Sequence, residues 1–118
     1  MITEDYVSFE TAKLLKEKGF DEFTISYYYK NGSMGFSEVD TRVSDGYQRP
    51  TLQMAMKWLR ETHNLGVFLT WTQVFGCYRW RVYYLKKGSQ ELYSVGANYN
   101  TYEEACEAAI KYCLENLI

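Results

Sequence analysis

A helical pattern near the middle of the chain constrains the fold more than any other feature. Within residues 50–63, four apolar side chains recur at the i, i+3, i+4, i+7 spacing that places them on one helical face. These residues are Leu52, Ala55, Met56 and Leu59. Met54 and Trp58 widen the stripe, and Thr51 is expected to be the N-cap of this helix. Because so broad an apolar face must be covered, we expect the elements on either side of this helix to pack around it.

Two further helices are indicated by their end signals. The first is expected to begin after Ser8, a suitable N-cap, and to end at Gly19, which with Phe20 behind it has the pattern of a Schellman stop. The last begins with a capping box formed by Thr101 and Glu104. Its apolar stripe comprises Cys106, Ala109, Ile110, Cys113, Leu114 and Leu117. The side chains expected to face solvent are Glu103, Glu104, Glu107, Lys111 and Glu115.

Between the first two helices the sequence predicts a hairpin. Residues 23–29 alternate with period two, which indicates a strand with one buried face. The pair Asn31 and Gly32 follows at once and favours a tight turn, because both residues tolerate positive φ. The return strand, residues 34–38, is short and contains a glycine, so we place it at a sheet edge. Residues 39–49 show no periodicity and are expected to form a long loop that is either functional or mobile.

Three strands are predicted after the central helix. They span residues 67–75, 78–85 and 91–99, and glycine-containing turns separate them, which favours antiparallel pairing. Alternation along the middle strand assigns its side chains to two faces. One face carries Tyr78, Trp80, Val82 and Tyr84. The other carries Arg79, Arg81, Tyr83 and Leu85.

The order of elements, α-β-β-α-β-β-β-α, predicts an α+β fold. We expect one domain, residues 1–118, in which helices pack on one face of an antiparallel sheet. Residues 51–118 have the α-β-β-β-α order of double-stranded RNA-binding domains. In that family the second helix begins with lysines that contact the phosphates of the duplex. At the matching positions this chain has Glu103, Glu104 and Glu107, which would repel the phosphates. The comparison therefore supports the topology and argues against binding of duplex nucleic acid.

Composition excludes several classes of protein. A formal net charge of -2 and a pI near 5.4 argue against a general attraction to nucleic acid or to anionic membranes. No apolar run is long enough to span a bilayer and the first residues lack the features of a signal peptide, so we expect a cytoplasmic protein. The three cysteines lack the spacing of a zinc site or a disulfide framework. Cys106 and Cys113 are therefore interpreted as small buried apolar residues.

The sequence contains few candidates for catalysis. The glycine-rich phosphate-binding motifs, the metalloprotease motif HExxH and the nucleophile motif GxSxG are all absent. The single histidine, His63, is explained by its position at a helix end, where a positive charge is favoured. Cys77 as a nucleophile with His63 as its base remains a weak alternative. We predict no catalytic residue, no metal site and no cofactor.

The middle predicted strand supplies the candidate binding site. Arg79, Arg81 and Tyr83 lie on its open face, and Tyr93 is expected beside them on the next strand. Arginine forks and tyrosine rings on a rigid sheet can hold a planar anionic ligand such as a nucleotide by bidentate hydrogen bonds and stacking. The alternative is that these residues simply give an exposed strand its polar and aromatic cover.

Three segments of the chain resemble a known group of proteins. Residues 5–22, 50–60 and 101–118 are similar to small uncharacterised proteins encoded by gut Bacteroidales bacteria and by their phages and prophages. The resemblance covers the helices, whereas the strands and the 39–49 loop diverge. It implies a phage or prophage origin and action in the cytoplasm of the bacterial host, and it brings no established catalytic residue.

Together these features predict a non-enzymatic phage or prophage accessory protein. It would sequester a host signalling nucleotide or inhibit a host defence protein, using Arg79, Arg81, Tyr83 and Tyr93 with the 39–49 loop. The alternative is a structural or assembly protein that forms homo-oligomers through its aromatic sheet faces. The expected partners are thus a nucleotide-like small molecule, a host protein or a second copy of the chain, and neither duplex nucleic acid nor a membrane.

Overall fold

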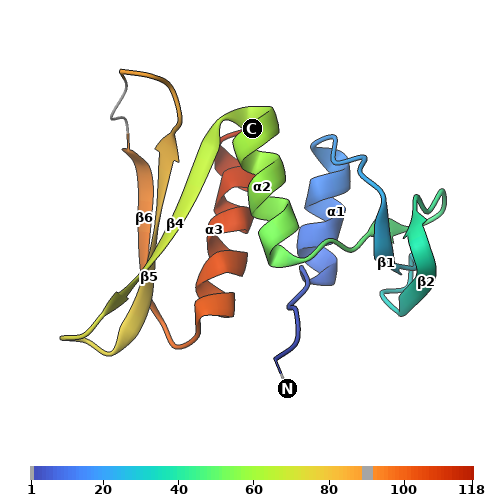
Figure 1. Cartoon of the computed structure of the whole chain (residues 1–118), viewed down its shortest axis with the longest axis horizontal. Coiled ribbons are helices and arrows are strands. Elements are labelled where there is room, and N and C mark those ends of the chain that lie inside the picture. The colour runs from blue at the N-terminus through green and yellow to red at the C-terminus, as the bar shows by residue number, and fades with distance from the viewer. Residues whose placement is uncertain (1, 89–91) are drawn as a thin grey trace.

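The chain folds into two small sheets with three helices between them. The computed structural model describes residues 2–88 and 92–118, without the side chains of residues 92–94. The elements are α1 (Phe9–Glu17), β1 (Thr24–Tyr28), β2 (Met34–Thr41), β3 (Tyr47–Gln48), α2 (Leu52–His63), β4 (Leu65–Thr72), β5 (Cys77–Tyr84), β6 (Leu92–Tyr99) and α3 (Tyr102–Asn116). The first sheet has the strand order β2-β1-β3 and the second the order β4-β5-β6, and both are antiparallel. The helices form a layer between the two sheets (Figure 1).

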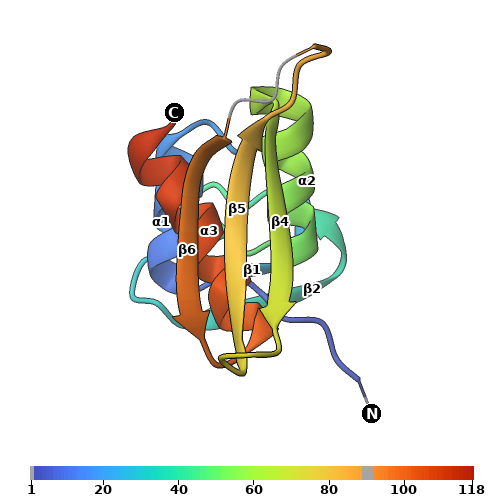
Figure 2. The ribbon, with the colours of Figure 1, turned by 90° about the vertical axis from the view of Figure 1, so that its left-hand side faces the viewer.

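The predicted α+β class and antiparallel pairing are confirmed. The second sheet matches the expected arrangement, because α2 and α3 both contact it and lie on the same side (Figure 2). The first sheet is separate from the second. Helix α1 lies between the first sheet and α3, because it contacts β3 on one side and α3 on the other. The strands are therefore divided between two sheets, and the short strand β3 is added to the predicted order.

The helix boundaries follow the predicted end signals. Each of the three predicted N-cap side chains accepts a hydrogen bond from the backbone three residues later, and these caps are Ser8, Thr51 and Thr101. At the end of α1, the Phe20 N–H donates to the Leu15 carbonyl at 2.8 Å and the Gly19 N–H donates to the Lys16 carbonyl at 3.2 Å. Gly19 has φ +98°, a left-handed conformation that suits glycine. The Schellman stop is thus confirmed.

The connection from α2 to β4 is shorter than predicted. Asn64 takes the left-handed conformation with φ 57°, so the chain turns at once and β4 begins at Leu65 rather than at residue 67. The strand also ends earlier, at Thr72. Residues 73–75, which we assigned to the strand, lie in the turn that the hydrogen bond from the Gly76 N–H to the Thr72 carbonyl closes at 2.8 Å.

The buried face of β1 is polar, because its side chains find partners inside the protein. Gln48 Nε2 donates to Thr24 Oγ1 at 2.8 Å, and Arg49 Nη1 donates to Ser26 Oγ at 2.8 Å. The Tyr28 hydroxyl donates to a backbone carbonyl at 2.7 Å. Satisfied polar groups can be buried at little cost. The apolar residues of the alternation, Phe23, Ile25 and Tyr29, are consequently on the exposed face.

The predicted 39–49 loop is wrong in part. Strand β2 continues to Thr41, and β3 adds a two-residue strand beside β1. Gln48 organises the remaining loop, since its Nε2 donates to the Thr41 carbonyl at 2.7 Å and its Oε1 accepts from the Val43 N–H. The loop is therefore held by the hydrogen bonds of one buried amide side chain, and it lacks the period-two pattern by which a longer strand could have been predicted. The prediction of β2 as an edge strand is confirmed.

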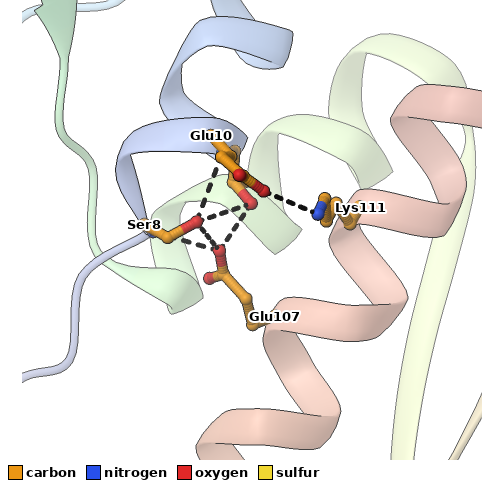
Figure 3. Close-up of polar contacts among 5 residues, drawn as sticks. Ser8, Glu10, Glu107 and Lys111 are labelled. Carbon is orange, nitrogen blue, oxygen red and sulfur yellow. Dashed lines mark hydrogen bonds and ion pairs between the residues drawn. The ribbon is translucent and has the colours of Figure 1, made fainter.

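Glu107, predicted to face solvent, instead joins α3 to the start of α1. Its Oε1 accepts from the Ser8 N–H at 3.0 Å, from Ser8 Oγ at 2.5 Å and from Thr11 Oγ1 at 2.5 Å (Figure 3). The carboxylate lies where the unpaired N–H groups and the positive end of the α1 dipole favour a negative charge. Nearby, Lys111 Nζ and Glu10 Oε2 form an ion pair at 3.0 Å (Figure 3).

The core lies between α3 and its neighbours, and it includes two of the cysteines. Cys106 and Cys113 are fully buried free thiols, as predicted. Burial disfavours the thiolate, and it raises the pKa of Cys106 to about 11 and that of Cys113 to about 12. These thiols are therefore packing groups rather than nucleophiles.

Candidate functional site

The second sheet has one face covered by helices and one face open. Figure 2 shows strands β4, β5 and β6 in front, with the helices behind them. Residues directly paired across antiparallel strands point to the same face. We call the uncovered side the open face, and its side chains are Phe68, Thr70, Arg79, Arg81, Tyr83 and Val95.

The covered face fixes which residues must point outward. Trp80 is 4% exposed, Val82 is fully buried, and the Trp80 ring lies 5.3 Å from the ring of Tyr112 on α3. Gly96, paired with Trp80, leaves room for the indole, because a Cβ there would meet the ring at 2.1 Å. With Trp80 and Val82 anchored inward, the period-two alternation of β5 directs Arg79, Arg81 and Tyr83 outward.

The rings and arginines of the open face lie next to one another. Arg81 is paired with Phe68 on one side and with Val95 on the other, and Arg79 is paired with Thr70. The Phe68 and Tyr83 rings form an edge-to-face pair with centroids 5.7 Å apart. Phe68 is nevertheless 48% exposed, so much of its ring remains accessible. Two guanidinium groups thus stand beside one exposed ring, that of Phe68, and one half-buried ring, that of Tyr83.

The two arginines have no charged partner in the part of the chain that the structure describes. The ion pairs among those residues involve Lys30, Arg42 and Lys111, and none involves Arg79 or Arg81. Arg79 Nε is buried yet has no hydrogen-bond partner among the described residues. A guanidinium left without an acceptor can bind an anion without first breaking an internal interaction.

The overall negative charge conceals a local positive region. Residues 65–88, which form β4, β5 and the adjoining turns, contain four cations and no acidic residue. The rest of the chain has nine cations against fifteen acids. The cations of this region are Arg79, Arg81, Lys86 and Lys87. The charge of residues 65–88 is therefore opposite in sign to the net charge of the chain.

Three of the four predicted site residues lie where the sequence placed them. Arg79, Arg81 and Tyr83 share the open face of β5, whereas the side chain of Tyr93 lies outside the described residues. The sequence reasoning missed Phe68 and Val95. The turn at Gly76 could have identified Phe68, since counting back equal numbers of residues along both strands places it opposite Arg81.

The weak alternative of a Cys77 and His63 pair is contradicted. His63 is the last residue of α2 and lies just before the start of β4. Cys77, the first residue of β5, is paired with Thr72 at the other end of β4. Eight residues of strand span about 23 Å at the usual rise per residue. Cys77 lies near Thr72 Oγ1, at 3.2 Å, and His63 contacts the Trp58 ring.

The first sheet also has an arginine beside a cavity. This cavity, of about 430 Å³, lies between β1 and the start of α2 and is lined in part by Tyr6, Phe23 and Arg49. Arg49 is already engaged, because its guanidinium stacks on the Tyr6 ring at 4.2 Å and donates to Ser26. This arginine stabilises the fold, so the cavity offers no free cation for an anionic ligand.

No group of three or more histidine, cysteine, aspartate or glutamate side chains in residues 2–88 and 92–118 is placed to hold a metal ion. No helix in the same ranges is long and apolar enough to cross a membrane.

Comparison with protein families, curated proteins and solved structures found no match to this chain. The functional assignment therefore depends on the geometry of the open face.

Proposed function

We propose that this is a non-enzymatic binding protein whose open face takes a planar, anionic, nucleotide-like ligand. The observation that supports the proposal is the pair Arg79 and Arg81, which have no acidic partner among the described residues and lie beside the exposed ring of Phe68 and the half-buried ring of Tyr83. The arginines would bind the phosphate oxygens by charge-assisted hydrogen bonds. The rings would contact the base by stacking.

In the phage or prophage setting that the sequence resemblance implies, the ligand would be a signalling nucleotide of the host. The protein would act in the host cytoplasm and lower the free concentration of that nucleotide by sequestration. If the partner is a protein instead, the open face would bind and inhibit a host defence protein.

Binding of ATP, GTP and cyclic AMP, measured by isothermal titration calorimetry, tests the proposal. We expect R79A/R81A to weaken binding at least tenfold, because each charge-assisted hydrogen bond contributes more than about 1.4 kcal/mol. The matched control is K57A/R60A, which removes the same charge from the exposed surface of α2. Equal losses in both variants, or no loss in the first, would place the site elsewhere.

A second candidate function is homo-oligomerisation through aromatic surfaces. It is favoured by the tip of the β4–β5 hairpin, where Val74 is 88% and Phe75 is 77% exposed, with Trp71 also exposed beside them. Contiguous exposed apolar side chains commonly mark an interface. Light scattering at micromolar concentration tests this candidate, and V74S/F75S is expected to convert an oligomer to a monomer. A wild-type protein that stays monomeric would contradict it.

A further inference from the structure

The open face extends along a strand rather than around a pocket. Arg79 and Arg81 are alternate residues of β5, so their Cα atoms are about 6.6 Å apart along the strand. Tyr83 continues the same line, and Lys86 and Lys87 follow where the strand ends. A single nucleotide would occupy one part of this line and leave the remaining cations unused.

We infer that the ligand of the open face is a single-stranded polynucleotide, an inference that rests on the proposed function and names its ligand class. Successive phosphates of an extended strand would contact successive cations along β5. Unpaired bases would stack on the rings of Phe68 and Tyr83. Phe68 lies beside Arg81 on β4, and Tyr83 lies two residues after Arg81 on β5.

The same geometry disfavours duplex nucleic acid. The bases of a duplex stack on one another, so the rings of the open face would have no accessible base to contact. The acidic residues that open α3, Glu103 and Glu104, occupy the positions where a duplex-binding fold of this topology needs cations. Arg79 and Arg81 lie on the sheet instead, with Lys86 and Lys87 just beyond the end of β5, where a flexible strand can follow them.

Fluorescence anisotropy with labelled oligonucleotides of 4, 8 and 12 residues tests the inference. We expect affinity to rise with length, with oligouridylate and oligothymidylate as separate arms that distinguish RNA from DNA. For the wild type, log K should fall linearly with log salt concentration. In R79A/R81A the slope should become shallower by about 1.4, because each phosphate contact to a single strand contributes about 0.7. K57A/R60A should keep the wild-type slope.

Stacking is tested with two phenylalanines of nearly equal exposure. Phe68 on the open face is 48% exposed and Phe23 on the first sheet is 51% exposed. We expect F68A to weaken oligonucleotide binding about 5- to 100-fold, the range found for loss of a base-stacking ring. F23A should bind as the wild type does. Thermal melts of both variants show whether the fold is retained.

The possible results separate this inference from the proposed function. Length-dependent binding that R79A/R81A and F68A both weaken supports the two together. A second result would be that ATP or GTP binds in a way that depends on the arginines, while the affinity for oligonucleotides does not rise with their length. This result overturns the polynucleotide inference and leaves the proposed function standing. Binding of a 12-base-pair duplex as tight as that of the single strand also overturns the inference. Absence of binding to every nucleotide and oligonucleotide, or binding that the arginine variant does not change, overturns both.

Discussion

The two sheets differ most in how they treat their positive charges. In and beside the first sheet, Lys30 pairs with Asp45 at 2.9 Å, Arg42 pairs with Asp21 at 3.2 Å, and Arg49 donates to Ser26. In the second sheet, Arg79 and Arg81 have no such partner among the described residues. Arg49 and Arg79 each have a buried Nε without a hydrogen-bond partner among the described residues, so the contrast lies in the remaining contacts. The cations of the first sheet make interactions within the protein, whereas Arg79 and Arg81 make no ion pair with the described residues and can contact a ligand.

The β4–β5 pair, which carries Arg79 and Arg81, is more regular than the β1–β2 pair, although the β5–β6 pair of the second sheet also shifts register at two places. The β4–β5 pair runs without interruption from Leu65 opposite Tyr84 to Thr72 opposite Cys77. The β1–β2 pair has a jump in register, because Thr24 is opposite Thr41 while Ser26 is opposite Phe36. A regular ladder holds alternate side chains at constant spacing, which suits recognition of a repeating ligand. The first sheet instead buries the polar side chains of Thr24 and Ser26.

The largest expected effect compares the two aromatic residues that lie over a glycine of the neighbouring strand. A Cβ at Gly96 would meet the Trp80 ring at 2.1 Å, and one at Gly35 would meet the Tyr27 ring at 2.4 Å. Trp80 is buried, so W80A should lower the free energy of unfolding by about 3–5 kcal/mol. Tyr27 is half-buried on the outer face, and Y27A should cost about 1 kcal/mol. Urea denaturation measures both, and equal losses would contradict the assignment of inner and outer faces.

The junction between the two halves gives the next largest effect. Removing the Glu107 carboxylate takes away the acceptor of three hydrogen bonds and leaves the buried Thr11 hydroxyl, which still accepts from Ser8 Oγ at 3.2 Å, without an acceptor for its own proton. We expect E107A to lower the free energy of unfolding by about 2–3 kcal/mol. The control is E115A, an exposed residue of the same helix, which should change stability by less than about 0.5 kcal/mol. Similar values for both variants would show that Glu107 does not join α1 to α3.

Single arginine substitutions test the contrast of partnered and free cations directly. R49A should lower the free energy of unfolding by about 1–2 kcal/mol, because it removes the bond to Ser26 and the contact with the Tyr6 ring. R81A should change it by less than about 0.5 kcal/mol, since Arg81 makes no ion pair among the described residues. A large loss in R81A would mean that this arginine supports the fold rather than a ligand.

The smallest expected effect concerns the exposed pair Glu10 and Lys111. The Lys111 ammonium, through its hydrogen bond and its charge, holds the pKa of the Glu10 carboxyl below its ordinary value of 4.5. The pair therefore contributes stability above pH 4.5, and the contribution is lost as the pH falls through the lowered pKa of the folded state. K111M should return the Glu10 pKa to its ordinary range in a ¹³C NMR titration. An unchanged titration would show that the ion pair does not persist in solution.

Local signals in the sequence were sufficient for the helices and for the faces of β5. The caps Ser8, Thr51 and Thr101 and the stop at Gly19 depend on a few neighbouring residues, so the sequence reveals them. The period-two alternation likewise placed Arg79 and Arg81 on the face of β5 opposite to that of Trp80. These features need no knowledge of which strand pairs with which.

The division into two sheets could not be predicted, because it depends on long-range pairing. The two-residue strand β3 has no period, and it is held by the side chain of Gln48. The buried face of β1 is determined by hydrogen-bond partners such as Arg49, which lies 23 residues after Ser26. That no acid among the described residues pairs with Arg81 also emerges only once Phe68 and Val95 are known to flank it.

Chemical-shift mapping tests the central claim, that the open face of the second sheet is the binding surface. Octauridylate is titrated into ¹⁵N-labelled protein, and the backbone and arginine side-chain resonances are followed. The largest shifts should fall on Phe68, Arg79, Arg81 and Tyr83. Shifts confined to the first sheet, around Phe23, Ile25 and Tyr29, or no shifts at all, would contradict the account.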